Sequence, residues 1–216
     1  MTAEPAGTPI TWSLVVPVKV LAEAKSRLAA LAGPYRPQLA LAMAADTVAA
    51  ALACVDVARV IAVTDDEDAA RLLAGLGAVV TPDEPGNGLN AALRHGALLA
   101  SARWPESGIG ALAADLPALR PAELSLGLRA AARWPQAFVP DAAGSGTTLY
   151  AARPGFAFSP RFGPGSAERH RAAGAAELSL PGLASLRRDV DAPPDLREAS
   201  DLGIGPRTAA VAAKLS

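Results

Sequence analysis

The sequence predicts an α/β fold in three layers, with helices on both faces of a mostly parallel β-sheet. Two observations support this fold class. Short apolar runs alternate along the chain with longer stretches that have apolar residues at helical spacing. The first apolar run is also continuous, which is typical of a strand buried on both faces. With 216 residues, of which 51% are hydrophobic, the chain is long enough to bury a full core in one domain.

The first half of the chain shows the alternation most regularly. Residues 13–18 form an apolar strand, and helical spacing over 36–55 predicts a long, largely buried helix with Pro37 in its first turn. Asp66 can cap the next helix, which ends at Gly77. In chain order, strands are expected at 13–18, 59–64, 78–81 and 109–114, and helices at 36–55, 66–76 and 89–103.

The second half contains more loops. Gly- and Pro-rich stretches flank a strand-like segment at 147–151, and Ser166 can cap the helix that follows the second stretch. The remaining strands are expected at 137–140, 147–151 and 186–190, and the remaining helices at 122–134, 166–173 and 191–203. We therefore expect a single domain over residues 1–216, with a core of about 12–205 and flexible tails at 1–11 and 206–216.

The bulk composition excludes several function classes. A net charge of −1 and an aromatic content of 4% argue against a nucleic-acid partner. Cys54 is the only cysteine, so an intrachain disulfide and a thiolate zinc cluster are excluded. His95 and His170 lie far apart in sequence and give little support to a histidine metal site. Because no apolar stretch reaches about 18 residues and the start lacks a signal-peptide pattern, we expect a cytoplasmic protein without a membrane partner.

A cluster of positive charge follows the first strand. Lys19, Lys25 and Arg27 lie within nine residues and are opposed only by Glu23. Crowding these cations is costly unless solvent or an anion neutralises them. The carboxyl end of a buried strand is where open α/β sheets bind ligands, so the cluster is either a phosphate site or a solvated loop. The glycine patterns of a P-loop and of a dinucleotide-binding fingerprint are both absent from the sequence.

Three aspartates are candidates for a metal site. Asp115 follows directly on a predicted strand and falls on the same sheet edge as the basic cluster. A hard divalent cation is one partner for such a carboxylate, and a helix cap or a salt bridge with Arg120 is another. Asp189 and Asp191 are two residues apart and share a face in an extended segment. One of them could supply a second carboxylate, unless Asp191 only prepares the following helix start.

Glycine-rich segments supply a further candidate site. Residues 146–148 and 163–166 combine glycines, which let backbone amides approach a ligand, with hydroxyls that can donate to a phosphate or carboxylate. They form either an anion pocket without a central cation or two mobile turns. A third segment, 86–93, enters a helix with Asn90, whose amide could read the edge of a nucleobase.

A series of short motifs runs through the chain in this order: Val16-Pro17-Val18-Lys19, Ala24-Lys25-Ser26-Arg27-Leu28, Gly88-Leu89-Asn90, Ala114-Asp115-Leu116-Pro117, Gly146-Thr147-Thr148-Leu149, Phe162-Gly163-Pro164-Gly165-Ser166 and Asp189-Val190-Asp191-Ala192-Pro193. Their order and spacing resemble the phosphoenolpyruvate or 2-phospholactate guanylyltransferases of coenzyme F420 biosynthesis. The resemblance covers about Trp12 to Gly205 and implies a Rossmann-like nucleotidyltransferase fold of the glycosyltransferase-A type.

The resemblance also implies roles for individual residues. GTP would be bound by Lys19, Lys25, Ser26, Arg27, Gly88 and Asn90, with Asn90 near the guanine. Mg²⁺ would be held by Asp115 together with Asp191 or Asp189. Phosphoenolpyruvate would be gripped by Thr148, Gly163 and Ser166, with Thr147 as a competitor for the role of Thr148. Lys19, Lys25 and Asp115 would be the catalytic residues. Ala192 stands where the family pattern has Thr, which leaves open which aspartate faces the metal.

The implied reaction moves GMP from GTP onto the phosphate of phosphoenolpyruvate, giving enolpyruvoyl-2-diphospho-5'-guanosine and pyrophosphate. The acceptor phosphate is already an anionic nucleophile, so positioning and charge neutralisation can carry the chemistry. The same reaction on 2-phospho-L-lactate, cytidylyl transfer to a sugar acid or alcohol, and a non-catalytic nucleotide-binding regulatory module remain open alternatives. A downstream transferase of coenzyme F420 biosynthesis is the protein partner that the resemblance suggests.

Overall fold

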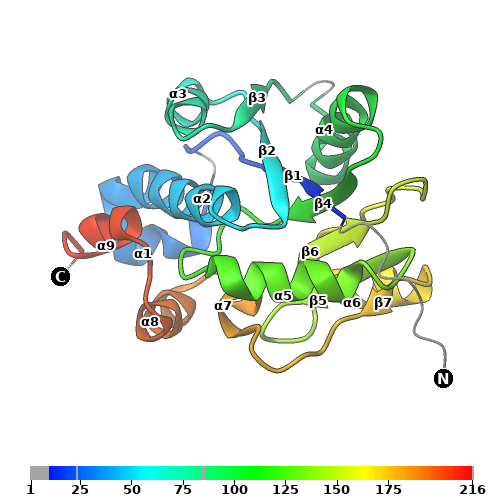
Figure 1. Cartoon of the computed structure of the whole chain (residues 1–216). Coiled ribbons are helices and arrows are strands. Elements are labelled where there is room, and N and C mark those ends of the chain that lie inside the picture. The colour runs from blue at the N-terminus through cyan, green and yellow to red at the C-terminus, as the bar shows by residue number, and fades with distance from the viewer. Residues whose placement is uncertain (1–9, 23, 84–85, 216) are drawn as a thin grey trace.

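The computed structural model describes residues 10–22, 24–83 and 86–215. Within them, a seven-stranded sheet has the spatial order β3-β2-β1-β4-β6-β5-β7 (Figure 1). Its strands are β1 (Trp12–Pro17), β2 (Val57–Val63), β3 (Val79–Thr81), β4 (Gly108–Leu112), β5 (Gln136–Pro140), β6 (Thr147–Ala152) and β7 (Ala176–Glu177). Strands β1 to β4 correspond to the four strands expected in the first half of the chain.

The pairing of the strands is mostly parallel, which confirms the predicted sheet type. β1 pairs in parallel with β2 and β4, β2 with β3, and β5 with β7. β6 is the exception, because it runs antiparallel to both β4 and β5. Its connection to β5 is a short turn in which the Asp141 carboxylate accepts hydrogen bonds from the amides of Ser145 and Gly146. A connection this short joins antiparallel strands, whereas a parallel pair needs a long crossover.

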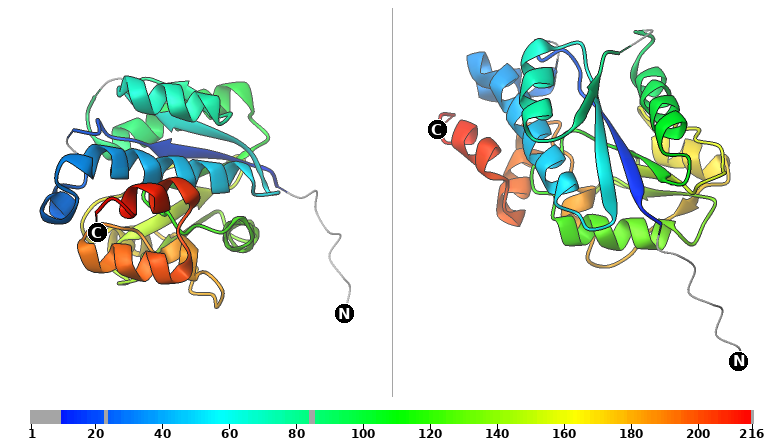
Figure 2. Two further views of the ribbon diagram at one scale, coloured as in Figure 1. Left: turned by 90° about the vertical axis from the view of Figure 1, so that its left-hand side faces the viewer. Right: turned by 45° about the horizontal axis from the view of Figure 1, so that its top comes forward.

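Helices cover both faces of the sheet, as the sequence predicts (Figures 1 and 2). One hydrophobic core lies between the sheet and helices α2, α3, α5 and α7, and a second lies between the other face and helices α4 and α6. The helices are α1 (Ala29–Ala32), α2 (Arg36–Leu52), α3 (Glu67–Gly75), α4 (Leu89–Arg103), α5 (Pro121–Ala131), α6 (Ser166–Ala172), α7 (Ala184–Arg187), α8 (Pro193–Leu202) and α9 (Pro206–Ala212).

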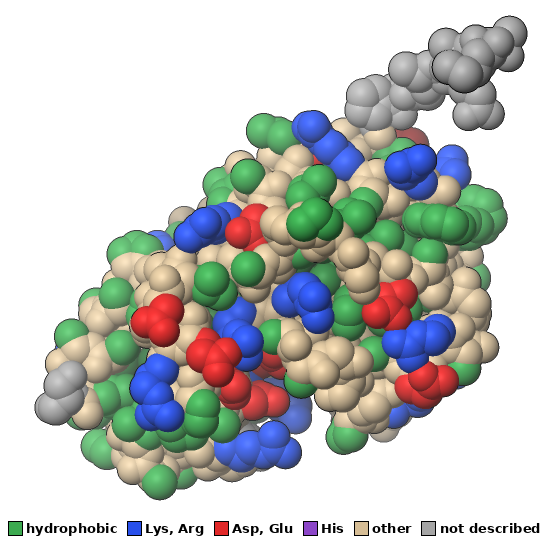
Figure 3. Space-filling model, turned by 90° about the horizontal axis from the view of Figure 1, so that it is seen from below, with side chains coloured by type: hydrophobic (Ala, Val, Ile, Leu, Met, Phe, Trp, Pro, Cys, Tyr) green, Lys and Arg blue, Asp and Glu red, His purple; other side chains and the backbone are tan. Residues whose placement is uncertain are grey.

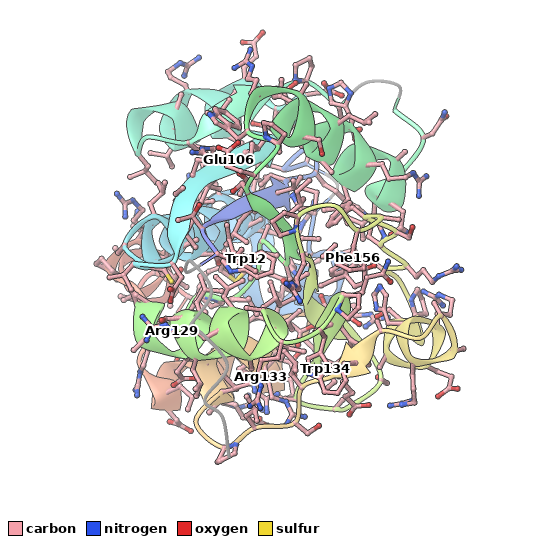
Figure 4. All side chains as sticks on the ribbon, turned by 45° about the vertical axis from the view of Figure 1, so that its right-hand side comes forward. Trp12, Glu106, Arg129, Arg133, Trp134 and Phe156 are labelled. Atoms are coloured by element: carbon pink, nitrogen blue, oxygen red, sulfur yellow. The ribbon has the colours of Figure 1, made fainter. Side chains whose placement is uncertain are left out.

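Strand β1 shows how the two cores share the sheet. Leu14 and Val16 belong to one core and Val15 belongs to the other, and all three are fully buried. Burying an aliphatic side chain of this size stabilises the fold by about 1.5 to 3 kcal/mol. Trp12 lies in the interior between β1 and α5 (Figure 4). A Cβ atom on Gly108 would fall 2.5 Å from the Trp12 ring, so a glycine is needed beside this indole.

The predicted strand at 186–190 is wrong. Residues 184–187 form the short helix α7, and the N–H of Val190 donates a 3.1 Å hydrogen bond to the carbonyl of Asp115, which follows β4 in the chain. Leu183 and Leu186, three residues apart, both enter the core beneath α5. That spacing matches a helical turn better than an extended strand, in which the two side chains would point to opposite faces.

The expected C-terminal tail also differs from the structure. Residues 206–212 form helix α9, which packs along α2 (Figure 2). The buried carboxylate of Asp46 on α2 accepts hydrogen bonds from the amides of Thr208, at 2.7 Å, and Arg207, at 3.3 Å. This segment is therefore part of the packed structure, because it satisfies a buried carboxylate. Of the expected N-terminal tail, residues 1–9 lie outside the described residues.

The described surface adds two observations. No helix of the described chain is long and apolar enough to cross a membrane. On the face shown in Figure 3, basic and acidic side chains are interspersed, and neither sign covers a continuous area. That face therefore lacks the extended positive field that attracts a polyanion.

Candidate active site

The loop after β1 folds over the carboxyl edge of the sheet and is fixed at several points. The Val18 N–H donates to the carbonyl of Val63 at 2.9 Å, and the Leu21 N–H donates to the carboxylate of Asp66 at 3.0 Å. The guanidinium of Arg36 donates to the carbonyl of Ala22 at 2.8 Å. The loop is therefore anchored on β2, on the start of α3 and on the start of α2. Asp66 also caps α3, as the sequence predicts.

Lys25 has the most unusual backbone in this loop. Its φ of 54° makes it the one non-glycine residue with positive φ in the part of the chain that the structure describes. The left-handed conformation costs an L-residue about 1 to 2 kcal/mol. This strain is offset by the contacts that the side chain makes, because Lys25 is held between two carboxylates from distant parts of the chain.

The two carboxylates belong to Asp115 and Asp191. The Lys25 ammonium donates to Asp115 and to Asp191, the latter at 2.7 Å. Burial alone would lower the pKa of Lys25, but the charges of the two aspartates outweigh it and hold that pKa above its ordinary value. Burial alone would raise the pKa of Asp191, but the Lys25 charge outweighs it and holds that pKa below its ordinary value. Lys25 and Asp191 are therefore both charged near neutral pH.

These residues line a cavity of about 390 Å³ at the carboxyl edge of β1 and β4. Lys19, Ser26 and Arg27 line the same cavity, and Arg27 lies 3.9 Å from the Asp191 carboxylate. The wall is completed by apolar side chains from several elements, among them Leu21, Leu89, Leu93, Leu112 and Phe162. A cavity of this size with a few convergent charges is typical of a small-molecule site.

Asp189 occupies a different position from its neighbour two residues away. The described residues that line the cavity do not include Asp189, although Asp189 lies close to Asp115 and Asp191, which do line it. Burial, followed by the charges of Asp115, Asp191 and Asp141, raises the pKa of Asp189 to about 7. The structure therefore brings Asp191, rather than Asp189, against Lys25. The amides of Asp191 and Ala192 are in turn fixed by the Asp195 carboxylate at 3.0 and 2.7 Å, at the start of α8.

The carboxylates of Asp115 and Asp191 are suited to binding a hard cation. Asp115 and Asp191 already hold one positive charge between them, the ammonium of Lys25. Mg²⁺ is typically bound by one or two carboxylates, with waters and substrate phosphates as the other ligands. Among the described residues no group of three His, Cys, Asp or Glu side chains is arranged to hold a metal ion. The donor set therefore fits a cation that is bound together with a phosphate.

The hydroxyls of the second candidate site are buried between β6 and α6. Thr147 and Ser166 lie with their hydroxyl oxygens 3.0 Å apart, and the Thr147 oxygen is also 3.0 Å from Nδ1 of His170. Gly163, with a φ of 117°, begins the turn that leads into α6, and its carbonyl accepts the Ser166 N–H at 3.0 Å. The Thr148 hydroxyl is buried and has no hydrogen-bond partner among the described residues.

Asn90 has a partner that the sequence did not predict. Its side-chain NH₂ donates to the carbonyl of Phe162 at 3.0 Å, and its side-chain oxygen accepts the Phe162 N–H at 2.8 Å. Gly88, expected beside the nucleotide, is the residue before α4 and has a φ of 86°. We expected the Asn90 amide at the edge of a guanine. In the structure both ends of that amide hold the segment before α6 against α4.

His170 is the site residue that sequence reasoning missed. The sequence gives little support to a histidine metal site and assigns His170 no role. It follows Ser166 by four positions on α6, so both side chains lie on one face of that helix. This spacing is the signal that could have linked it to the predicted hydroxyl site.

Comparisons with known proteins agree with the fold. Residues 37–178 match the MobA-like NTP transferase domain family. The solved structure of CMP:2-keto-3-deoxy-manno-octonic acid synthetase in complex with CTP has a TM-score of 0.54 and 18% identity, over 89% of this chain and 98% of that one. A protein from Mycobacterium tuberculosis, solved in complex with manganese, has a TM-score of 0.51 and 21% identity, over 90% of this chain and 100% of that one.

The fold, the cavity and the match to the family model together identify the protein as a nucleotidyltransferase. A phosphoenolpyruvate guanylyltransferase from Thermomonospora curvata is 65% identical over 206 residues, which is 95% of this chain and 90% of that protein. The chain belongs to the phosphoenolpyruvate guanylyltransferase family, so the resemblance seen in the sequence is confirmed.

Proposed function

We propose that the protein transfers GMP from GTP onto the phosphate of phosphoenolpyruvate, releasing pyrophosphate, as a step of coenzyme F420 biosynthesis. The observation that carries this proposal is the Lys25 ammonium held between Asp115 and Asp191 in the cavity at the carboxyl edge of β1 and β4. A nucleotidyltransferase must hold a triphosphate and a cation at such a place, and Lys19 and Arg27 line the same cavity. The family to which the chain belongs supports guanylyl transfer to phosphoenolpyruvate.

The donor nucleotide occupies the charged half of this site. Lys19, Lys25, Ser26 and Arg27 contact the triphosphate, and Gly88 and Asn90, which flank the cavity-lining Leu89 at the start of α4, contribute to the nucleotide site. Asp115 and Asp191 hold Mg²⁺, and Asp189 is the alternative second ligand. When bound, the ion neutralises charge on the phosphates and orients them for an in-line reaction. The manganese complex of the M. tuberculosis protein supports a divalent metal in this fold.

The acceptor acid occupies the half built from β6 and the turn before α6. Thr148 supports this assignment, because its hydroxyl is buried without a hydrogen-bond partner in the described part of the chain and an anion would supply one. Gly163 offers its backbone and Ser166 offers a hydroxyl, while Thr147 competes with Thr148 for the role of the first hydroxyl. Neutral donors suffice here because the cations of the donor half already offset the charge of both substrates.

The chemistry needs no strong general base. A phosphate oxygen of the acceptor attacks the α-phosphorus of GTP, a new P–O bond forms, and the bond between the α-phosphorus and the bridging oxygen to the β-phosphorus breaks. The electron pair leaves with pyrophosphate, whose charge Lys19, Lys25 and Arg27 stabilise. Positioning two anions within reach of each other is the main task of the protein, and the cations of the donor half accomplish it.

A panel of substrates tests the proposal. Pyrophosphate release is measured with GTP, CTP or ATP and Mg²⁺, each with phosphoenolpyruvate, with 2-phospho-L-lactate and without an acid. We expect release with GTP and phosphoenolpyruvate well above all other pairs. Release with CTP and no response to GTP would overturn the nucleotide assignment, and preference for 2-phospho-L-lactate would overturn the acceptor. Stabilisation by GTP without product from either acid would instead indicate a nucleotide sensor.

A further inference from the structure

His170 lies at the centre of the acceptor half and touches neither solvent nor the cavity. Its side chain is fully buried, and its ring stacks on Tyr150 with centroids 4.8 Å apart. The rings of Phe138 and Phe162 lie 5.4 and 5.6 Å away. Packing of this kind fixes the plane of the imidazole. Both ring nitrogens nevertheless have polar partners, and these partners belong to different elements.

The hydrogen bonds determine which nitrogen carries the proton. The Arg161 backbone N–H lies 2.8 Å from Nε2, and an amide N–H can only donate. Nε2 is therefore the unprotonated acceptor, so the proton of the neutral ring is on Nδ1 and is donated to the Thr147 hydroxyl. Burial, followed by the charges of Arg169 and Arg161, lowers the pKa of His170 to about 4, in agreement with a neutral ring.

The fixed tautomer leaves a donor available in the hydroxyl pair. His170, Thr147 and Ser166 together carry one N–H and two O–H hydrogens, and the contacts among them use the N–H and one O–H. Whichever hydroxyl donates to the other, one hydroxyl hydrogen is left for an acceptor outside this group. With the opposite tautomer, Thr147 would have to donate to Nδ1, and fewer hydrogens would remain for another acceptor.

The same ring also anchors the turn before α6. Its Nε2 holds the Arg161 amide, and Asn90 holds both backbone groups of the next residue, Phe162. The side chain of Arg169 donates to the Arg161 carbonyl at 2.9 Å. The segment that leads to Gly163 is therefore held from α4 and α6 together, and His170 links it to the hydroxyls of β6 and α6.

We propose that His170 is a positioning residue for the acceptor substrate, resting on the function proposed above. As a neutral, Nδ1-protonated imidazole it keeps the hydroxyl pair of Thr147 and Ser166 a hydrogen-bond donor toward an anionic acid, and through Nε2 it holds the neighbouring backbone. His170 does not touch the reacting atoms. Its removal therefore impairs the use of the acceptor acid much more than the binding of GTP.

Two amide substitutions separate the two roles. The amide of His170→Asn can donate from the position of Nδ1, whereas that of His170→Gln can accept at the position of Nε2. We expect His170→Gln to raise the KM for phosphoenolpyruvate on the order of tenfold, about the value of one lost hydrogen bond, with the KM for GTP within about twofold of wild type. His170→Asn keeps a KM for the acid nearer to wild type, but it loses hydrogen-exchange protection at the Arg161 amide. His95→Asn, at the other histidine, is the matched control and changes neither quantity.

A double substitution tests whether His170 acts through Thr147. Thr147→Val removes the hydroxyl at nearly constant volume, so the Thr147→Val, His170→Gln pair is expected to be no worse for the acid than Thr147→Val alone. Additive effects of the two changes, or equal changes in the KM values for GTP and the acid, would overturn the proposal. Wild-type protein that makes no product from GTP and phosphoenolpyruvate would instead overturn the proposed function, so the two failures are distinguishable.

Discussion

The two halves of the site are built from opposite kinds of interaction. The half around Lys25 depends on formal charges, a strained backbone and side chains that reach into an open cavity. The half around His170 consists of neutral hydroxyls, an imidazole and backbone amides, nearly all of them buried. A charged pair can exchange one ionic partner for another, whereas a buried neutral network keeps its geometry only while every link is satisfied.

This contrast suggests how the site treats its two substrates. In the charged half, the ammonium of Lys25 stands between the carboxylates where a metal would bind, so binding of a metal and a triphosphate requires these groups to change partners. In the neutral half the hydrogen bonds that link His170 to Thr147, Thr147 to Ser166 and the Arg161 amide to His170 are already formed. Substitutions in the charged half should therefore change the binding of GTP and the turnover. Substitutions in the neutral half should change the use of the acceptor acid.

The largest effect is expected at Asp115. Asp115→Ala removes a proposed ligand of the metal that stabilises the transition state, and losing one such transition-state interaction costs about 10² to 10³ in kcat. Pyrophosphate release with GTP, Mg²⁺ and phosphoenolpyruvate measures the loss, and circular dichroism checks the fold. Asp68→Ala, on the exposed face of α3, is the matched control and should keep wild-type turnover. Near-normal turnover of Asp115→Ala would contradict the metal assignment.

A smaller effect is expected at Lys25. Lys25→Met keeps the length of the side chain but removes the charge that faces the triphosphate. Charge-assisted hydrogen bonds contribute about 1.5 to 3 kcal/mol, so the Kd for GTP should rise about tenfold to a hundredfold. Calorimetric titration of the protein with GTP and Mg²⁺, without the acid, measures this Kd. Lys214→Met, at an exposed position near the end of the chain, serves as the control. If Ser166→Ala weakened GTP binding as much as Lys25→Met did, the division of the site into two halves would be contradicted.

The sequence predicted the elements that local patterns define. The sheet type, the long helix α2 and the Asp66 cap of α3 follow from apolar runs, helical spacing and capping chemistry, and the structure confirms them. The cation cluster and Asp115 could be assigned to one sheet edge because both directly follow strands that are parallel neighbours.

The remaining features depend on contacts between distant residues. The antiparallel placement of β6 and the packing of α9 onto Asp46 are set by tertiary partners that local spacing does not reveal. Asn90 is bonded to a residue 72 positions away, and His170 joins Thr147 to a backbone amide from another segment. Side chains with several compatible partners, such as amides and imidazoles, are the ones whose roles sequence reasoning predicted least well.

Asn90 gives a sharper test of the boundary between the halves. Asn90→Ala removes both hydrogen bonds to the Phe162 backbone and should lower the free energy of unfolding by about 1 to 3 kcal/mol. We expect the KM for phosphoenolpyruvate to rise severalfold, with the preference for GTP over CTP unchanged. Denaturant unfolding and competition kinetics measure the two effects. Loss of the GTP preference would place this amide at the guanine instead.

The smallest effect concerns pH. Because the pKa of His170 is lowered to about 4 in the folded protein, the unfolded chain binds more protons between its ordinary value of 6.5 and 4. The contribution of His170 to stability is therefore complete above pH 6.5 and is lost as the pH falls toward 4. Between pH 6.5 and 5.5 wild type should lose about 1 kcal/mol more than His170→Gln, which does not titrate. Parallel pH profiles of the two proteins in urea unfolding would contradict a neutral, buried imidazole.

The most direct test of guanylyl transfer at this two-part site is the ³¹P NMR spectrum of the reaction of GTP, Mg²⁺ and phosphoenolpyruvate. A new phosphorus–oxygen–phosphorus linkage between the acid and GMP gives a pair of coupled doublets, and we expect these together with an equal amount of pyrophosphate. Pyrophosphate accompanied by free GMP and unchanged phosphoenolpyruvate would show that water, and not the acid, is the acceptor. That result would contradict the assignment of the β6–α6 half to the acid.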